Sequence, residues 1–255
     1  MRFVLDLNMS RDEKLIDILK DGHNIILIDD FFVELFKSND PVKTFELNTK
    51  ILQKYSSQIY YCHDIGILFR LEKIGRPLKK HQLIDMKTTS IIRKLILMPD
   101  IFQSQIEKFK IEASKRISEQ ENFIQEYLRK TTQQLSALLK STASRNAYIV
   151  DKEKRLCDIM GTTFLVMERY LIDNKNKKLF WEKPSVIFNY TYILLWRIVD
   201  WALKNGITDK PINKLTNDGF DLRYIMYSSY FDDVLTKESW LSECRSDCML
   251  SFKCK

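Results

Sequence analysis

Hydrophobic and polar positions divide the chain into two similar ends and a long middle. Near the start, apolar runs at 2–7 and 24–28 predict two buried strands. The amphipathic stretch 11–20 between them predicts a helix, and Asp29 or Asp30 is expected to cap another helix over about 31–38. Because strand, helix, strand is the repeating unit of a parallel sheet, this end predicts such a sheet.

The middle of the chain, from about 42 to 203, changes to the 3.6-residue period of helices with charged faces. A stretch without Gly or Pro from 100 to 160 predicts a long helix or helical hairpin, and 190–203 predicts a helix buried on most sides. The end of the chain returns to the first pattern, with a helix expected over 221–230 and a short strand over 234–236.

These elements predict an α/β fold in which a parallel sheet is flanked by helices. We expect residues 1–41 and 212–255 to form the core and residues 42–211 to form a large all-helical insertion with flanking helices. With 6 Gly and 5 Pro in 255 residues, the chain has little material for the turns of a sandwich or barrel. A composition of 45% hydrophobic and 29% charged residues is that of a folded protein.

The composition also predicts a cytoplasmic protein without a membrane partner. No apolar run approaches the roughly 20 residues that cross a bilayer. The first eight residues lack the charged and then apolar regions of a secretory signal. The 5 cysteines are an odd number without a tight framework, which fits reduced thiols.

Carboxylates near the chain ends are the candidates for chemistry. Asp6 ends the first strand, Glu34 lies on the helix after the second, Asp221 starts a predicted helix, and Asp233 and Glu238 flank the late strand. Acids at the carboxyl ends of parallel strands can converge at one edge. Converging carboxylates repel each other unless a cation neutralises them, and oxygen ligands favour Mg²⁺ or Mn²⁺. One or two such ions can activate water against a phosphodiester.

The order of these motifs resembles the PIN-domain nucleases. Residues 4–8, Val-Leu-Asp-Leu-Asn, are similar to the D-x-N motif that closes the first strand of that family, and Glu34 stands in an "xxEL" setting. Asp221 starts a predicted helix fifteen positions before Thr236. Where the family's "vTxD" motif ends in Asp, this chain has Glu238.

The resemblance covers about 1–40 and 212–242 and implies a role for each matched residue. The implied metal ligands and catalytic acids are Asp6, Glu34 and Asp221, with Asp233 or Glu238 as the fourth; the implied supporting residues are Asn8, Thr236 and Asp218. The family further implies a divalent-metal-dependent endoribonuclease, similar to bacterial toxin or phage-defence (antiviral) effectors. Such effectors are restrained by a partner protein, which the insertion would bind if it does not bind substrate. A homo-oligomer is left open.

A basic stretch from 70 to 94, with a net charge of +6, is a candidate RNA-binding surface. The alternative is an ordinary solvated face. Its basic residues are Arg70, Lys73, Arg76, Lys79, Lys80, Lys87, Arg93 and Lys94. Three aromatic residues just upstream of it, Tyr60, Tyr61 and Phe69, are candidates to stack on unpaired bases.

Two other functions fit the same residues. A PIN-like core could be a non-catalytic scaffold that binds RNA or a partner protein, and a DNA nuclease would use the same acids. Fold resemblance alone does not separate these from a ribonuclease.

Overall fold

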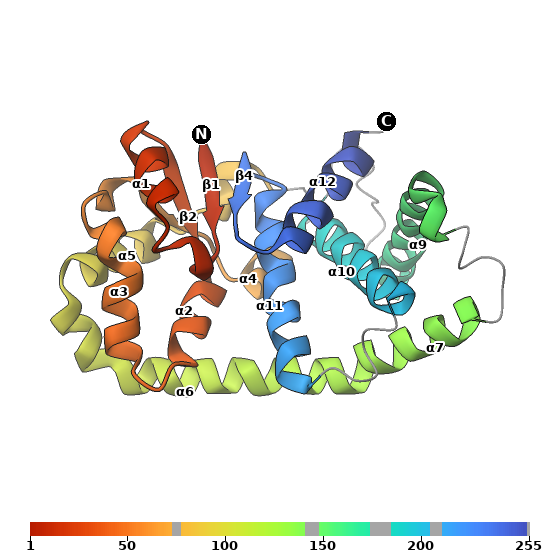
Figure 1. The fold of residues 1–255 in the computed structure, drawn as a ribbon, viewed down its shortest axis with the longest axis horizontal. Coiled ribbons are helices and arrows are strands. Elements are labelled where there is room, and N and C mark those ends of the chain that lie inside the picture. Colours follow the sequence, from red (N-terminus) through yellow and green to blue (C-terminus); the bar gives the residue numbers. More distant parts are fainter. Residues whose placement is uncertain (73–77, 141–147, 174–184, 205–210, 254–255) are drawn as a thin grey trace. The chain divides into compact units, whose positions relative to one another are not determined.

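A computed structural model describes residues 1–72, 78–140, 148–173, 185–204 and 211–253 (Figure 1). The chain forms two compact units, which are described separately because their relative positions are not determined. Unit 1 consists of Met1–Leu68, Leu78–Ser118 and Tyr227–Ser242. Unit 2 consists of Phe69–Pro77, Glu119–Met226 and Glu243–Lys255.

Unit 1 contains a parallel four-stranded sheet of order β3-β2-β1-β4. Its strands are β1 (Arg2–Leu5), β2 (Asn24–Leu27), β3 (Ile59–Tyr61) and β4 (Asp233–Leu235). Ile25, Ile26 and Leu27 are fully buried, as expected where a parallel strand is covered on both faces. The predicted α/β class, a small parallel sheet flanked by helices, is confirmed.

The helices of unit 1 begin where the sequence supplies capping groups. Asp12, Asp40 and Asp85 each accept a backbone N–H bond at the start of a helix. The helices are α1 (Glu13–Lys20), α2 (Asp29–Phe36), α3 (Pro41–Gln53), α5 (Met86–Leu97) and the first part of α6 (Pro99–Phe123), with short 3₁₀ turns at Leu7–Met9, Ser56–Gln58 and Lys80–Leu83.

Two predicted features near the sheet differ from the structure. Strand β3 lies within 42–211, which was expected to be all helical, and it pairs with β2. Much of that segment therefore belongs to unit 1, not to a separate insertion on a core of 1–41 and 212–255. Helix α2 is the second case, because it begins at Asp29 with Ile28 at its N-cap position. Asp29 and Asp30 are thus buried in its first turn and are not caps.

The core of unit 1 packs between the sheet and these helices. Phe31 and Leu35 of α2 are fully buried in it, as are Phe45 of α3 and Ile96 of α5. Residues 31 and 35 are one turn apart, so the same face of α2 meets the core. The remaining face of α2 is free to line a cavity, as described below.

Unit 2 is helical among its described residues. Its helices are α4 (Ile65–Glu72, from Phe69 on), the end of α6, a π-helical segment (Ile124–Leu128), α7 (Arg129–Lys140), α9 (Lys152–Asp173), α10 (Val186–Leu203), α11 (Ile212–Ser228, to Met226) and α12 (Ser239–Lys253, from Glu243). Trp201 of α10 is buried against Ile124, Leu128 and Leu215. The helix predicted to begin at Asp221 begins at Ile212 instead.

A buried carboxylate fixes the start of α10. Glu72 is 6% exposed and accepts hydrogen bonds from the backbone N–H groups of Val186 (2.6 Å) and Ile187 (3.1 Å). The hydroxyl of Ser185 accepts another from the N–H of Phe188. The first N–H groups of a helix lack partners within the helix, and a negative charge there is favourable. Glu72 therefore joins α4 to α10 by hydrogen bonds and by charge.

We expect Glu72→Ala to lower the free energy of unfolding by about 2–3 kcal/mol, because buried N–H groups would lose a charged acceptor. Glu72→Gln, which keeps one acceptor oxygen, should cost less. Urea denaturation followed by circular dichroism measures the change, with the exposed Glu168→Ala on α9 as the matched control. Equal urea midpoints for Glu72→Ala and Glu168→Ala would show that this cap does not stabilise the fold.

Candidate functional site

The carboxyl ends of β1 and β4 bring the first predicted acid against a hydroxyl. Asp6 follows β1, is 2% exposed, and donates its backbone N–H to the carbonyl of Leu235 (3.0 Å). Its Oδ2 accepts a hydrogen bond from Thr236 Oγ1 (2.6 Å), and its Oδ1 accepts one from the N–H of Asn8 (3.3 Å). Two adjacent strand ends therefore fix the Asp6 carboxylate.

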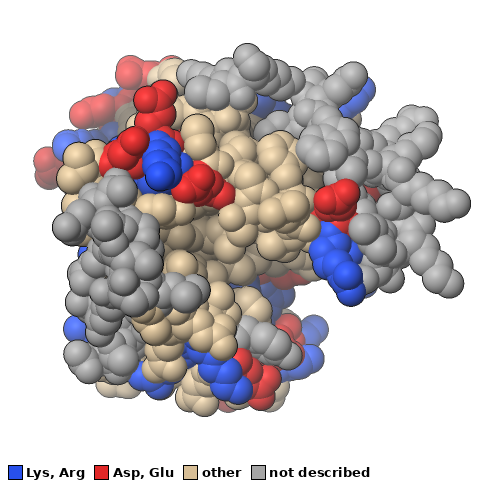
Figure 2. Space-filling view, turned by 90° about the vertical axis from the view of Figure 1, so that its right-hand side faces the viewer, with Lys and Arg blue, Asp and Glu red and all other residues tan. Residues whose placement is uncertain are grey.

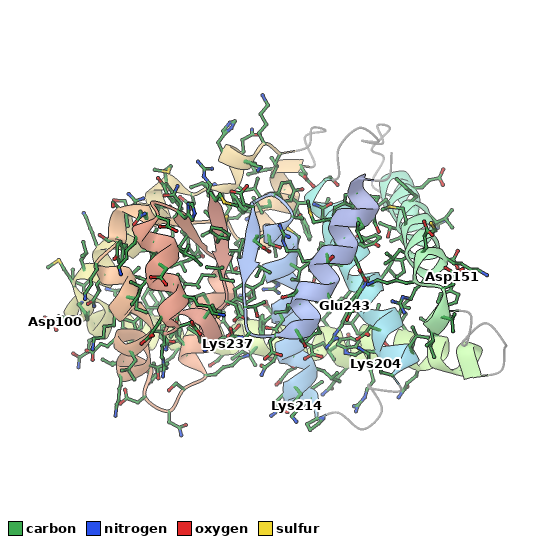
Figure 3. All side chains as sticks on the ribbon, turned by 45° about the horizontal axis from the view of Figure 1, so that its top comes forward. Asp100, Asp151, Lys204, Lys214, Lys237 and Glu243 are labelled. Carbon is green, nitrogen blue, oxygen red and sulfur yellow. The ribbon has the colours of Figure 1, made fainter. Side chains whose placement is uncertain are left out.

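The segment after β4 is tied to the segment after β1. The side-chain oxygen of Asn8 accepts from the N–H of Lys237 (3.0 Å), and Thr236 Oγ1 accepts from the N–H of Glu238 (3.0 Å). Lys237, labelled in Figure 3, directs its ammonium group to the Asp12 carboxylate (3.0 Å). Asn8 and Thr236 are thus placed to hold the backbone around Asp6 and Glu238.

Burial sets the protonation behaviour of Asp6. Removal from water raises the pKa of its carboxyl group, the hydrogen bonds from Thr236 and Asn8 lower it, and the charge of exposed Glu238 raises it again. The net direction is upward from 3.8. Asp6 therefore carries a charge that its surroundings disfavour, and a bound cation would relieve it.

The register of β4 separates the two alternatives for the fourth acid. Asp233 begins β4 opposite Phe3, three residues before Asp6, and its Oδ1 accepts from the N–H of Val234. At about 3.3 Å per residue, this places Asp233 roughly 10 Å along the strand, toward the amino edge. Glu238, which follows β4, is the alternative whose charge acts on Asp6.

The other predicted acids occupy different elements. Glu34 is half-buried on α2, on the same face as Asp30 one turn earlier. Asp221 is half-buried in the middle of α11 and belongs to unit 2. The structure therefore brings Asp6 and Glu238 together within unit 1, and it places Glu34 on a helix that begins at the same edge of the sheet.

Asp218, predicted as a supporting residue, has a structural role in unit 2. Its carboxylate pairs with the guanidinium of Arg197 (2.5 Å) and accepts from Trp201 Nε1 (3.2 Å). Arg197 also contacts Asp200 (2.8 Å). The side chain of Arg197 is 5% exposed, so these carboxylates neutralise a buried cation.

The carboxyl ends of β2 and β3 carry a second cluster of charged side chains, which the sequence analysis did not predict. Asp29 lies two residues after the end of β2 and Asp64 three residues after the end of β3, and Arg116 of α6 pairs with both carboxylates (3.2 Å to Asp64). Burial lowers the pKa of the Arg116 guanidinium, but the charges of Asp29 and Asp64 raise it by more. An acid that follows a buried apolar strand is the pattern that indicated Asp6, and Asp29 shows the same pattern after β2.

A metal centre of three or more ligands is not formed by the described residues. In the described ranges, no group of three or more His, Cys, Asp or Glu side chains is placed to hold a metal ion. Asp6 and Glu238 supply oxygen donors of the kind that Mg²⁺ and Mn²⁺ prefer, which is a partial fit. At Asp29 and Asp64, Arg116 offsets part of the negative charge of the acidic edge.

The basic stretch is divided between the two units. Arg70 lies in unit 2, and Lys73 and Arg76 lie outside the described residues. Within unit 1, the exposed lysines of this stretch are Lys79, Lys80, Lys87 and Lys94. Figure 2 shows one face of the molecule, on which the visible Lys and Arg side chains lie singly or in small groups beside acidic ones.

Arg93 and the neighbouring tyrosines have packing roles. Arg93 donates to the carbonyls of Ile59 (2.8 Å) and Ser57 (2.7 Å) and lies over the ring of Tyr60, 4.8 Å from its centroid. Tyr61 is half-buried and lines a cavity. These residues hold β3 in place, so they are poor candidates for contact with RNA.

Comparison with known proteins finds no family model that matches the chain, no similar curated protein and no similar solved structure. The resemblance to PIN-domain nucleases therefore stays a prediction. Among the described helices, none combines the length and apolar character that a membrane span requires.

We expect Asp6→Asn to raise the melting temperature at pH 7, because the amide keeps the hydrogen-bonding shape and removes a buried charge. The gain should be on the order of 1 kcal/mol, or about 2–4 °C. This stability gain is fully present above the pKa that Asp6 has in the folded protein, where wild-type Asp6 is charged. The gain shrinks as the pH falls through that pKa toward 3.8, because wild-type Asp6 then becomes protonated. Thermal unfolding of both proteins between about pH 4 and about pH 8 measures the gain.

Asp12→Asn is the control, for which we expect a change in stability of the opposite sign. Hydrogen bonds from Lys14 and Lys237 lower the pKa of Asp12, so removing its charge should cost stability near neutral pH and not add it. A lower melting temperature for Asp6→Asn than for wild type at pH 7 would contradict the charge strain assigned to Asp6.

Proposed function

We propose that this chain is a divalent-metal-dependent nuclease that hydrolyses RNA, with its site at the β1–β4 half of the sheet edge. The observation that carries the proposal is the buried Asp6 carboxylate, which Thr236 orients beside Glu238. Buried acids with raised pKa values are concentrated at functional sites. The carboxyl edge of a parallel sheet is also where binding sites form in open α/β folds.

The residues around Asp6 suit a cation of the Mg²⁺ or Mn²⁺ class. Thr236, the backbone N–H of Asn8 and the side chain of Asn8 donate three hydrogen bonds to the Asp6 carboxylate, which has about four lone-pair sites, so acceptor capacity remains for an ion. Glu238 adds an exposed carboxylate, and Glu34 of the same unit would have to supply a further ligand. A bound ion of this class supplies activated water and stabilises charge on a phosphodiester. Thr236 would act as a positioning residue, since it contacts Asp6 and not the substrate.

Contact with RNA would rest on the exposed lysines of unit 1. Lys79 and Lys80 lie on a 3₁₀ turn before α5, and Lys87 and Lys94 lie on α5 itself. All four lysines are exposed to solvent. Exposed lysines bind phosphates chiefly through charge, which makes the contact insensitive to sequence.

A non-catalytic scaffold is the second candidate, and a specific contact favours it. Arg116 already pairs with Asp29 and Asp64 at the β2–β3 half of the edge and offsets part of their charge. A protein that fills part of an acidic edge with its own cation needs no metal there. In this alternative the protein would bind RNA or a protein partner without cleaving it.

The first test is cleavage of labelled single-stranded RNA and DNA with Mn²⁺, Mg²⁺ or EDTA. We expect metal-dependent cleavage of RNA, a loss of about 10²-fold or more in Asp6→Asn and Glu238→Gln, and a loss of about 10-fold in Thr236→Val. Asp233→Asn is the matched control, since Asp233 lies toward the opposite edge of the sheet. Full activity of Asp6→Asn would show that Asp6 is not part of the catalytic site.

A protein that is folded and binds RNA but cleaves neither nucleic acid would support the scaffold candidate. Preferential cleavage of DNA would support the proposed site but show that the substrate is DNA and not RNA. These outcomes are separable because Asp6→Asn should remain folded, as its stability measurement reports independently.

RNA binding tests the lysines separately from the acids. We expect Lys79→Ala combined with Lys80→Ala to weaken binding of single-stranded RNA and to reduce the salt slope by about 1.4, or 0.7 per lost phosphate contact. Fluorescence anisotropy between about 50 and 200 mM salt measures the slope. Lys14→Ala combined with Lys20→Ala on α1 is the charge-matched control. Equal slopes for the two pairs would exclude Lys79 and Lys80 as phosphate contacts.

A further inference from the structure

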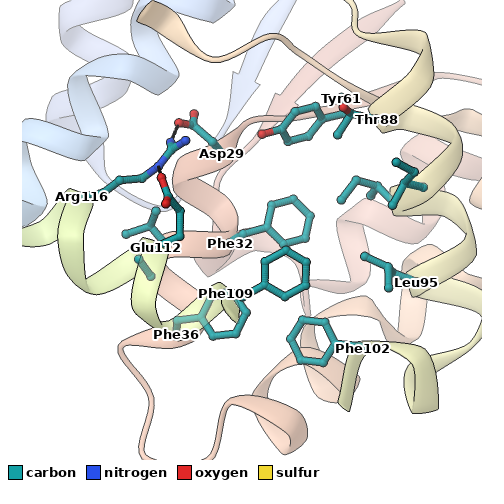
Figure 4. Close-up of a pocket in the computed structure, with 14 residues that line it drawn as sticks. Asp29, Phe32, Phe36, Tyr61, Thr88, Leu95, Phe102, Phe109, Glu112 and Arg116 are labelled. Carbon is teal, nitrogen blue, oxygen red and sulfur yellow. Dashed lines mark hydrogen bonds and ion pairs between the residues drawn. The ribbon is translucent and has the colours of Figure 1, made fainter. Parts of the chain in front are cut away.

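Unit 1 contains a cavity that the proposed nuclease site does not use. It has a volume of 310 Å³ and is lined by residues of α2, β3, α5 and α6 (Figure 4). Ligand sites are typically clefts of about 300–1,000 Å³ with mostly apolar walls and a few polar groups. Asp6 and Glu238 are not among the lining residues, so this cavity is a separate feature.

The apolar wall is built from packed aromatic rings. Phe36 stacks on Phe102 and on Phe109, each at 5.6 Å between ring centroids, and Phe102 stacks on buried Phe45 at 3.9 Å. Phe32 adds another ring on the same face of α2. Because these rings support one another across three helices, the wall is formed before any ligand arrives.

The polar end of the cavity carries more acid than base. Arg116 contacts the carboxylates of Asp29, Asp64 and Glu112, so three acids surround one guanidinium. Figure 4 shows Arg116, Asp29 and Glu112 together at one side of the cavity, with the rings of Phe32 and Phe109 beside them. Glu112 has a side chain that is 57% exposed, which makes it accessible to an entering molecule.

Tyr61 adds a polar group to the cavity wall. Burial raises the pKa of its hydroxyl group, and the charges of Asp29, Asp64 and Asp30 raise it further, while Arg116 lowers it. The pKa of Tyr61 lies well above 10, so the hydroxyl is protonated at neutral pH. It is therefore a neutral hydrogen-bonding group on the cavity wall.

We propose that this cavity binds an organic cation, a protonated amine or quaternary ammonium group on an apolar or aromatic body. The aromatic wall would take the body by burial of apolar surface, and the ring faces attract a cation. The excess of carboxylates would take the charge. An anionic ligand would instead have to displace Asp29 or Asp64 from Arg116 and face the remaining acids.

The test compares three probes with one carbon skeleton: 4-phenylbutylamine, 4-phenylbutanol and 4-phenylbutanoate. Binding is measured by titration calorimetry and ligand-observed NMR at neutral pH on the full chain. We expect the amine to bind about 10-fold more tightly than the alcohol, and the carboxylate to bind most weakly. Tightest binding of the carboxylate, or equal binding of all three probes, would overturn the proposal.

A charge variant tests the polar end. Glu112→Gln should weaken binding of the amine by about 3- to 10-fold and leave binding of the alcohol unchanged. Glu107→Gln is the matched control, since its side chain is 79% exposed on the same helix and does not line the cavity. Amine binding by Glu112→Gln that equals wild type would contradict the assigned recognition of charge.

A filling variant tests the location. Ile91 lines the cavity and is 49% exposed, so Ile91→Trp can extend over the mouth without disturbing the buried core. It should reduce binding of the amine and of the alcohol by about 10-fold or more. Ile111→Trp, at a 72% exposed position outside the cavity, should bind as wild type. Unchanged binding by Ile91→Trp would place the probe elsewhere.

Discussion

The pairing of β1 with β4 is the constraint on which the rest of unit 1 depends. It joins segments about 230 residues apart, so its backbone hydrogen bonds must offset a large loop-closure entropy. The pairing extends beyond the strands: Asp232 donates its N–H to the carbonyl of Arg2 (2.9 Å), and Asp6 donates to Leu235 (3.0 Å). Thr236 reaches Asp6 only because this register holds. The candidate acid site is therefore a direct product of the long-range strand pairing.

The carboxyl edge of the sheet resolves the burial of acids in two different ways. At β2 and β3, the protein supplies a cation, Arg116, which joins Asp29 to Asp64. At β1, the carboxylate of Asp6 receives neutral donors, a hydroxyl and an amide, while the charge of Glu238 opposes it. Hydrogen bonds reduce the cost of a buried charge but do not cancel it. The acids at β2 and β3 therefore have a cationic partner from the protein, whereas Asp6 at β1 is held by neutral hydrogen-bond donors.

The sequence predicts the elements with continuous apolar runs and misses those fixed by distant contacts. β1, β2 and β4 stand out locally, whereas β3 is three residues long and two of them are half-buried tyrosines held by β2 and Arg93. The motif around Asp6 and Thr236 pointed to residues that do meet. Arg116 could not be found in this way, because it lies 87 residues from Asp29 on a helix with many charged positions. Long-range ion pairs depend on tertiary packing, which no local pattern encodes.

The neighbourhood of Asp6 supports the proposed binding of a cation at the β1–β4 half of the edge. Lys237, next to Glu238 in sequence, turns its ammonium group to Asp12. The pair of Asp6 and Glu238 is held by backbone and hydroxyl contacts that fix geometry without adding positive charge. Natural sequences commonly retain such unfavourable groups where activity requires them, at some cost in stability. The β2–β3 half of the edge differs, because Arg116 supplies positive charge to its acids from within the protein.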